Sequence, residues 1–405
     1  MSMNFQNYSI KSFFLILFLL SLLIYNPISF FSNAPLIPTI VLVIFFLIYQ
    51  SFNTNLLKIN LTLSILITLY LGFTLIMHDI DLFSLINSYL YLIISITTGI
   101  LFINLLMLFD DAELIKIFKG IIIFILICAF LEIYFPAIKE LFQTIAISLH
   151  GNIYTSIDRD ISWYGFVRPI FITSEPSHLA IFLTFISTCL ILIDSSLKSL
   201  KNFFILYFLM LFLIRSPLLI SIFIVLFIVS VGKFNISKTH IFYLLFTTIA
   251  LIFLNYSRIE DFLLLSDRSS FIRLILPYLI YYNQSLLNIF FGTSFGNESL
   301  INSIYFQLDY FSLPQVNWDN IENRLVNSFA ELLIRFGLLG SFFIYFFLYK
   351  SFIPKISIKK IIILFIIIFC LCSLFGGVNG IRFWVVLLTM FYLYGLDYGK
   401  TYCKK

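Results

Sequence analysis

The stretch from Arg168 to His178 holds residue types that could do chemistry. It places a cation, a carboxylate at Glu175 and an imidazole within eleven residues, where an apolar segment begins. A carboxylate in that setting can act as a general base, with a pKa tuned by partial burial. His178 lies on nearly the same helix face. The alternative is electrostatic: Glu175 near a helix N-terminus stabilises the helix without catalysis, with Ser174 or Ser177 as the cap.

A single arginine stands between two short apolar segments. Arg215 occurs in the sequence Leu-Ile-Arg-Ser-Pro, with apolar runs on both sides. A guanidinium at membrane depth is energetically costly and normally faces a cavity or a partner group. We therefore predict that Arg215 has a function.

A second cluster of cations follows further along the chain, together with a glycine-spaced turn from Phe291 to Gly296. A Gly-x-x-x-Gly spacing usually marks only a tight turn. Guanidinium groups are planar and bind a phosphate through two parallel hydrogen bonds, so these arginines would suit an anionic ligand. The arginines of this cluster are Arg258, Arg268, Arg273 and Arg324.

The end of this cluster predicts the start of a helix. Asn327 is a good N-cap residue. Glu331 and Arg335 are four residues apart, a spacing at which two opposite charges on a helix can simply neutralise each other. That pairing leaves room for a functional role of either residue, so both interpretations stay open.

Composition decides what kind of protein must position these residues. Of the 405 residues, 61% are hydrophobic and 11% are charged, and the mean hydropathy is +1.05. Soluble domains have roughly a quarter of their residues charged, so this chain cannot present an ordinary water-facing surface. We predict an all-α, polytopic integral membrane protein in contact with the lipid bilayer, with one membrane domain over residues 1–405.

About twelve apolar segments predict the transmembrane helices, with ten as the alternative count. The seventh and eighth are short and could form a hairpin that does not fully cross the membrane. The first is too long for a signal-peptide core and is interpreted as a retained span. The predicted spans are 12–31, 36–50, 60–77, 84–108, 120–138, 177–194, 202–214, 217–231, 240–256, 329–349, 361–377 and 381–396.

The lysines orient these spans. With the N-terminus in the cytoplasm, fifteen of the sixteen lysines fall on the cytoplasmic side, and only Lys139 falls outside. Positive charge in short loops favours that side. We therefore predict that both termini are cytoplasmic and that two long loops, 139–176 and 257–328, are extracytoplasmic.

The arginines have the opposite distribution. All nine fall in predicted outer loops or near the outer ends of spans, where a cation is unfavourable. This sorting indicates an anionic ligand at the outer face. The alternative is that some arginines pair with nearby carboxylates, namely Asp158, Asp160, Asp261 or Asp267.

Several motifs are missing from the sequence. It contains no P-loop, no dinucleotide-binding fingerprint and no metal-ligand cluster. No hydrophilic segment is long enough for a cytoplasmic domain that could hold a nucleotide or a nucleotide sugar. We therefore expect no cofactor, no metal and no nucleic-acid partner, and a substrate that is already activated outside the cytoplasm.

The order of these pieces resembles the O-antigen polymerase (Wzy) family, within the wider O-antigen ligase/polymerase superfamily. The resemblance covers roughly residues 160–345. The matching pieces are Arg168…Ser-Glu175-Pro-Ser-His178-Leu-Ala, Arg215-Ser-Pro, Ser-Asp-Arg268…Arg273, Phe-Gly292-Thr-Ser-Phe-Gly296 and Asn327-Ser-Phe-Ala-Glu-Leu-Leu…Gly337-Leu-Leu-Gly340.

The resemblance implies a membrane glycosyltransferase at the periplasmic face of the inner membrane. Members join oligosaccharide repeats carried on undecaprenyl diphosphate, and a chain-length regulator protein is an expected partner. In this interpretation Arg215, Arg268 and Arg273 hold diphosphate, and Glu175 is the substitute base, so Glu175 and Arg215 are the expected catalytic residues. The expected substrate-binding residues are Arg168, His178, Arg258, Arg268, Arg273, Arg324 and Asn327.

Three alternatives to a polymerase stay open. Ligases of the superfamily usually carry His-Asn at the start of the helix after the large loop. Here Val326 precedes Asn327, which disfavours a ligase. A flippase for the same lipid-linked sugar should show repeat symmetry and charges near the bilayer midplane, and Glu132 is the main residue that would suit one. A structural scaffold would not need all of its arginines on the outer side of the membrane.

Overall fold

Helices are the only regular structure in the part of the chain that the structure describes, which confirms the all-α class. The structure is a computed structural model. It describes residues 2–23, 37–49, 52–78, 81–150, 157–194, 197–219, 275–295, 327–353, 358–373 and 377–396, with isolated positions at 222, 224, 225, 301, 303 and 304.

Five helices are long and apolar enough to cross a membrane. Each has at least 18 residues, close to the roughly 20 that a bilayer requires. They are α3 (Thr54–Met77), α4 (Leu82–Leu106), α5 (Asp111–Tyr134), α8 (Pro176–Ile193) and α17 (Ser328–Phe352). Shorter apolar stretches lie in α1 (Ser2–Ser21), α2 (Ile37–Tyr49), α9 (Leu197–Ile214), α18 (Ile358–Cys372) and α19 (Ile381–Leu396). These helices are compatible with a multi-pass membrane protein.

The candidate spans differ in how much apolar surface they expose. In α3, Leu61 is 63% exposed, Leu69 67% and Ile76 84%. Large apolar side chains in such numbers at the surface mark contact with a membrane or with another protein. The described part of α8 is instead almost entirely buried. The exposed apolar face of α3 is thus compatible with contact with lipid, whereas α8 is buried.

The chain forms two compact units. Unit 1 comprises 1–50, 103–259 and 400–405, and unit 2 comprises 51–102 and 260–399. The described helices of unit 1 are α1, α2, α5, α6 (Pro136–His150), α7 (Ile157–Tyr164), α8 and α9, followed by the 3-10 turn Pro217–Leu219. The prediction of one membrane domain stays a prediction.

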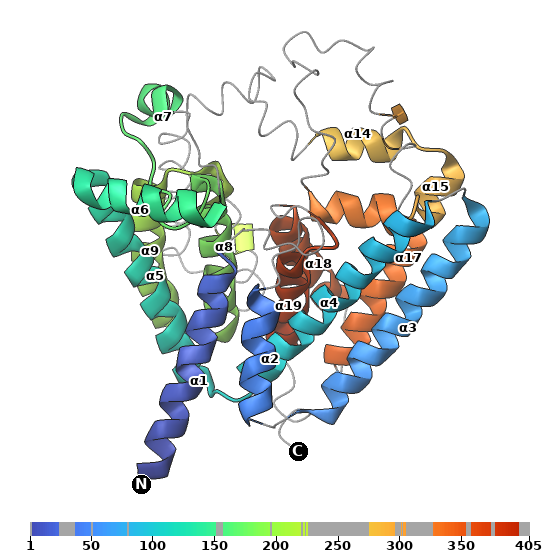
Figure 1. Cartoon of the computed structure of the whole chain (residues 1–405), viewed down its shortest axis with the longest axis horizontal. Coiled ribbons are helices and arrows are strands. Elements are labelled where there is room, and N and C mark those ends of the chain that lie inside the picture. Colours follow the sequence, from blue (N-terminus) through green and yellow to red (C-terminus); the bar gives the residue numbers. More distant parts are fainter. Residues whose placement is uncertain are drawn as a thin grey trace. The chain divides into compact units, whose positions relative to one another are not determined.

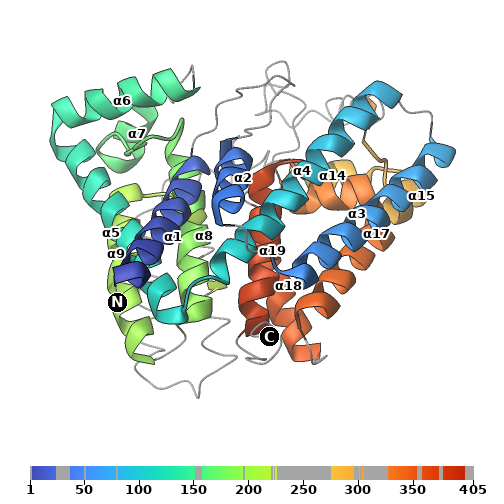
Figure 2. The ribbon, with the colours of Figure 1, turned by 60° about the horizontal axis from the view of Figure 1, so that its bottom comes forward.

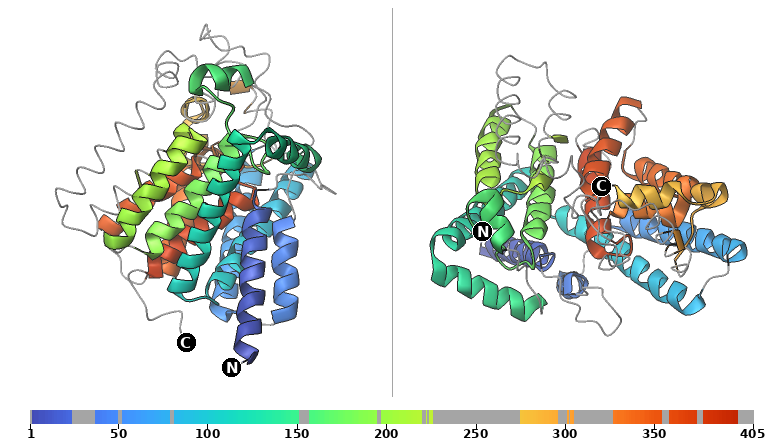
Figure 3. Two further views of the ribbon diagram at one scale, coloured as in Figure 1. Left: turned by 90° about the vertical axis from the view of Figure 1, so that its left-hand side faces the viewer. Right: turned by 90° about the horizontal axis from the view of Figure 1, so that it is seen from above.

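Unit 1 is organised around α5. This helix contacts α1, α8 and α9, and α5, α8 and α9 lie side by side (Figure 3, left). The predicted span 120–138 differs from α5 at both ends. A capping box joins Asp110 and Glu113, so the helix begins near residue 110. At the other end Pro136 starts a separate helix, α6, which turns sharply away from α5 (Figure 1).

Unit 2 is built around α17. It contacts α3, α14 (Leu276–Tyr282), α15 (Leu286–Phe291), α18 and α19, and α3 lies alongside it in Figure 2. The helix is interrupted at Gly337, whose φ is 63° and ψ −178°. The Tyr70 hydroxyl on α3 donates to the carbonyls of Phe291 and Phe336 next to this break. A buried break in a helix leaves backbone groups that must find such partners.

Candidate functional site

The catalytic residues predicted from the sequence gather around the segment that joins α7 to α8, residues 165–175 (the α7–α8 linker). Two prolines explain why it is not helical. Pro169 disfavours a helical conformation at the preceding Arg168, and Pro176 occupies the first position of α8. Gly165 has a φ of 77°, a left-handed conformation that glycine adopts readily. The linker therefore leaves α7 sharply and enters α8 at a fixed point.

Arg168 is held in a buried ion pair. Its Nη2 lies 2.9 Å and its Nε 3.0 Å from Oδ1 of Asp160 on α7, and its backbone N–H donates to Oδ2 at 3.2 Å. Both side chains are buried. Among the alternatives for the arginines, pairing with an aspartate therefore applies to Arg168. Its charge is compensated inside unit 1, which weakens its assignment to substrate binding.

Glu175 is the N-cap residue of α8, but its side chain makes no capping hydrogen bond. Neither Ser174 nor Ser177 is the cap, so that part of the electrostatic alternative is wrong, but Glu175 does lie at the N-terminus of α8 as that alternative requires. Oε2 of Glu175 instead accepts a hydrogen bond from the Ser177 hydroxyl at 2.7 Å. The side chain is half-buried. The carboxylate thus lies at the positive end of α8, which stabilises a negative charge.

His178 lies in the first turn of α8, close to the same residues. Its Nδ1 is 2.9 Å from Oγ of Ser174 in the linker. The imidazole is half-buried, as is Glu175. The serine contact fixes the orientation of the ring, and the carboxylate and imidazole stand together at one end of a helix.

Arg215 lies at the end of α9 with a φ of 45°, an uncommon conformation for a residue other than glycine. Its Nη1 donates to the carbonyl oxygen of Tyr164. The guanidinium carbon is 4.7 Å from the ring centre of Phe166 and 5.5 Å from that of Phe212. The guanidinium is thus oriented by aromatic faces and one carbonyl.

The guanidinium of Arg215 has a hydrogen-bond donor that no described residue uses. Its Nε is buried and has no hydrogen-bond partner, and no carboxylate in the described ranges pairs with it. Partial burial lowers the pKa of Arg215 from its ordinary value. An anion beside the group would therefore stabilise its charged form.

The end of α7 positions both arginines. The ring of Tyr164 lies 4.9 Å from the guanidinium carbon of Arg168, and the carbonyl of the same residue binds Arg215. Tyr164 is not among the residues that the sequence predicts for the site. Its role in orienting two cations depends on a contact between residues 51 positions apart, which no local pattern reveals.

Unit 1 thus places four predicted residues in or next to the α7–α8 linker: Arg168 and Glu175 belong to it, His178 contacts its Ser174, and Arg215 contacts its Phe166. Asn327 lies in unit 2, where it is fully buried as the N-cap of α17, and its Oδ1 accepts from the Ala330 N–H at 3.0 Å. This confirms the predicted cap. The other four predicted positions, Arg258, Arg268, Arg273 and Arg324, lie outside the described residues.

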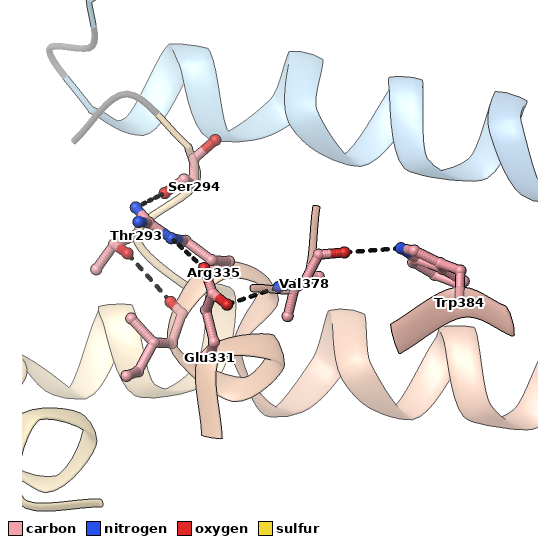
Figure 4. Close-up of polar contacts among 7 residues, drawn as sticks. Thr293, Ser294, Glu331, Arg335, Val378 and Trp384 are labelled. Carbon is pink, nitrogen blue, oxygen red and sulfur yellow. Dashed lines mark hydrogen bonds and ion pairs between the residues drawn. The ribbon is translucent and has the colours of Figure 1, made fainter. Parts of the chain in front are cut away.

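A second buried polar cluster surrounds the break in α17 (Figure 4). Nε of Arg335 is 3.8 Å from Oε1 of Glu331, so the predicted pairing of these charges is confirmed. Nη1 of Arg335 also donates to the Ser294 carbonyl at 3.0 Å. Oε2 of Glu331 accepts from the Val378 N–H at 2.6 Å, and Trp384 donates to the Val378 carbonyl at 2.8 Å. The pair ties three segments of unit 2 together, which is a structural task.

We predict that replacing Glu175 by glutamine leaves the protein inserted in the membrane but inactive. Glutamine keeps the size of the side chain and can still accept from Ser177, but it cannot take up a proton at neutral pH. The measurement is the product formed per unit of membrane-embedded protein. Full activity of the variant would show that this carboxylate is not a base.

The described residues contain no group of three or more histidine, cysteine, aspartate or glutamate side chains that could hold a metal ion. Comparisons with models of protein families, with curated proteins and with solved structures found no match. A function must therefore be inferred from the motifs and from the geometry of unit 1.

Proposed function

We propose that the protein is a membrane glycosyltransferase that joins oligosaccharide repeats carried on undecaprenyl diphosphate, as the O-antigen polymerases that it resembles do. The proposal includes about twelve spans in the inner membrane, two long extracytoplasmic loops and cytoplasmic termini. The lipid-linked repeat is both donor and acceptor, and the product is a longer repeat chain on one carrier.

The observation that carries this proposal is the set of groups around the Arg215 guanidinium, which contains no described carboxylate. Arg168 has a carboxylate partner, whereas the described partners of Arg215 are aromatic faces and one backbone carbonyl. A diphosphate supplies the oxygens that such a planar donor binds best. Donors fixed beside a leaving group stabilise the negative charge that develops on it as the glycosidic bond breaks.

The reaction also needs a proton acceptor. The bond between the anomeric carbon and the diphosphate oxygen breaks, and a new bond forms to the attacking sugar hydroxyl. The hydroxyl proton passes to Glu175, and undecaprenyl diphosphate leaves with its charge stabilised by Arg215. Glu175 is suited to this because its carboxylate is half-buried and is oriented by Ser177.

The proposal is tested by deleting the gene and separating the surface polysaccharide by gel electrophoresis. Loss of the ladder, with single repeats still on the lipid core, is the result we expect. Loss of all repeats from the core would contradict it and would indicate a ligase or a flippase. Those two are separated by the side of the membrane on which the lipid-linked repeat accumulates.

The proposed topology makes its own prediction. Cysteines added one at a time to the five native ones test it: Asp158→Cys and Tyr310→Cys should react with a membrane-impermeant maleimide in intact cells, and Lys355→Cys only after the cells are opened. Asp158 is exposed on α7, unlike its buried neighbour Asp160. The protein without an added cysteine is the control for background labelling. Reversed labelling would contradict the topology.

A further inference from the structure

Glu132 is a buried carboxylate in an apolar helix. It lies near the end of α5 and is 3% exposed. No lysine, arginine or histidine of the described ranges forms an ion pair with it. Ionisable residues inside a candidate span are costly and normally have a function. The partners of this carboxylate therefore indicate why it is there.

Both oxygens of Glu132 bind the α7–α8 linker. Oε1 accepts from the Ile170 N–H at 2.9 Å, and Oε2 accepts from the Phe171 N–H at 2.8 Å. The two donors are consecutive amides, so one carboxylate binds two neighbouring N–H groups at once. Charge-assisted hydrogen bonds of this kind are stronger than neutral ones, and more so away from water.

The amides belong to a tight turn that begins with an unusual conformation. The Thr173 N–H donates to the Ile170 carbonyl at 2.9 Å, which closes the turn Ile170–Thr173. Phe171 has a φ of 52°, a left-handed conformation that is a genuine outlier for a bulky side chain. Such strain persists only where the surroundings over-determine it.

Other contacts leave the turn with little freedom. Nε2 of His150 lies 2.9 Å from the Ile172 carbonyl oxygen, and the Phe171 ring packs edge-on against Phe142 at 5.2 Å. Oγ1 of Thr173 is 2.6 Å from the Ile170 carbonyl oxygen and 2.8 Å from that of Glu175. The turn is thus connected directly to Glu175, and Glu132 is the one carboxylate among its described partners.

We propose that Glu132 is a positioning residue, which fixes the α7–α8 linker and thereby the placement of Glu175. This inference rests on the proposed function for its effect on catalysis. It also accounts for a buried carboxylate in α5 without a transport pathway. Removing the carboxylate leaves Glu175 chemically intact but free to adopt other positions, and loss of orientation lowers turnover more than binding.

The test compares Glu132→Gln and Glu132→Asp with Glu140→Gln. Glutamine has nearly the same shape but presents an NH2 group to one of the two N–H donors, and aspartate keeps the charge but is shorter by one methylene. Glu140 is an exposed carboxylate on α6, so its variant is the matched control. Membrane content is measured for each protein, and if Glu132→Gln does not accumulate, Glu132→Asp replaces it.

Two readouts are taken. The first is the rate at which Ile172→Cys, placed in the turn, reacts with an impermeant maleimide. We expect about a tenfold increase in the Glu132 variants and none in the control. The second is turnover in membrane vesicles supplied with lipid-linked repeats. We expect kcat to fall about tenfold while KM changes by less than about twofold.

These outcomes distinguish the fixing of the α7–α8 linker by Glu132 from the proposed function. Unchanged labelling of Ile172→Cys in the Glu132 variants would show that Glu132 does not fix the linker, whatever the activity of these variants. Faster labelling with unchanged kcat would overturn the positioning role. If the parental protein itself forms no polymer, the proposed function fails, and the anchoring of the linker is decided by the labelling alone.

Discussion

Cells whose only copy of the protein carries Arg215→Lys will make surface polysaccharide with single repeats in place of a ladder, although the positive charge is kept. Lysine has a compact ammonium group in place of a planar fork. It cannot bind the Tyr164 carbonyl, lie against Phe166 and still present two parallel donors to a diphosphate. Loss of one donor to a developing negative charge typically costs about 10²–10³ in rate, so we expect polymer formation to fall at least about a hundredfold.

The measurement is the length distribution of polysaccharide in the deletion strain carrying each variant, divided by the protein present in the membrane. Arg168→Lys is the informative comparison because Asp160 already compensates that cation. Lysine can keep part of this ion pair, so we expect less accumulated protein but a ladder from what remains. A normal ladder from Arg215→Lys would contradict the diphosphate role.

The bounds of helices could be predicted where apolar length alone decides the structure. The predicted segments 177–194 and 381–396 agree with α8 and α19 to within one residue at each end. A run of apolar residues of that length has few alternatives to a helix in a membrane. The prediction failed at α5 because charged residues before 120 were assigned to a loop. They form the first turns of the helix, where acidic residues are favourable.

The site was predictable only where contacts are local. The pairing of Glu331 with Arg335 follows from a spacing of four residues on a helix. The contact of Glu132 with Ile170 joins residues 38 positions apart, and tertiary packing decides which carboxylate meets which amide. The sequence could show that Glu132 is an anomaly within an apolar segment, but not which groups it binds.

The break in α17 shows the same limit, because a glycine at position 337 is compatible with an uninterrupted helix. The structure gives Gly337 a φ of 63° and a ψ of −178°, a conformation that is essentially restricted to glycine. A Cβ at this position would lie 2.5 Å from the backbone nitrogen of Gly292. The backbones of two segments therefore meet here at a distance that no other residue allows.

Replacing Gly337 by alanine is thus expected to destabilise unit 2 strongly. The unfavourable dihedral angles alone cost about 1–3 kcal/mol, and the methyl group would have to displace the chain at Phe290 and Gly292. That movement would also pull Arg335 from Ser294 and Phe336 from the Tyr70 hydroxyl. We expect a cost of roughly 4 kcal/mol or more, comparable with much of the stability of a typical domain.

The matched control is Gly72→Ala on α3, in the same unit, where no atom would lie within 4 Å of the new Cβ. Alanine favours helices by about 0.5–1 kcal/mol over glycine, so this variant should be as stable as the parent or slightly more so. The measurement is the amount of membrane-embedded protein and its thermal stability in detergent. If Gly337→Ala accumulates and melts like Gly72→Ala, α17 continues through residue 337 as an ordinary helix, and the contacts that depend on its break do not form.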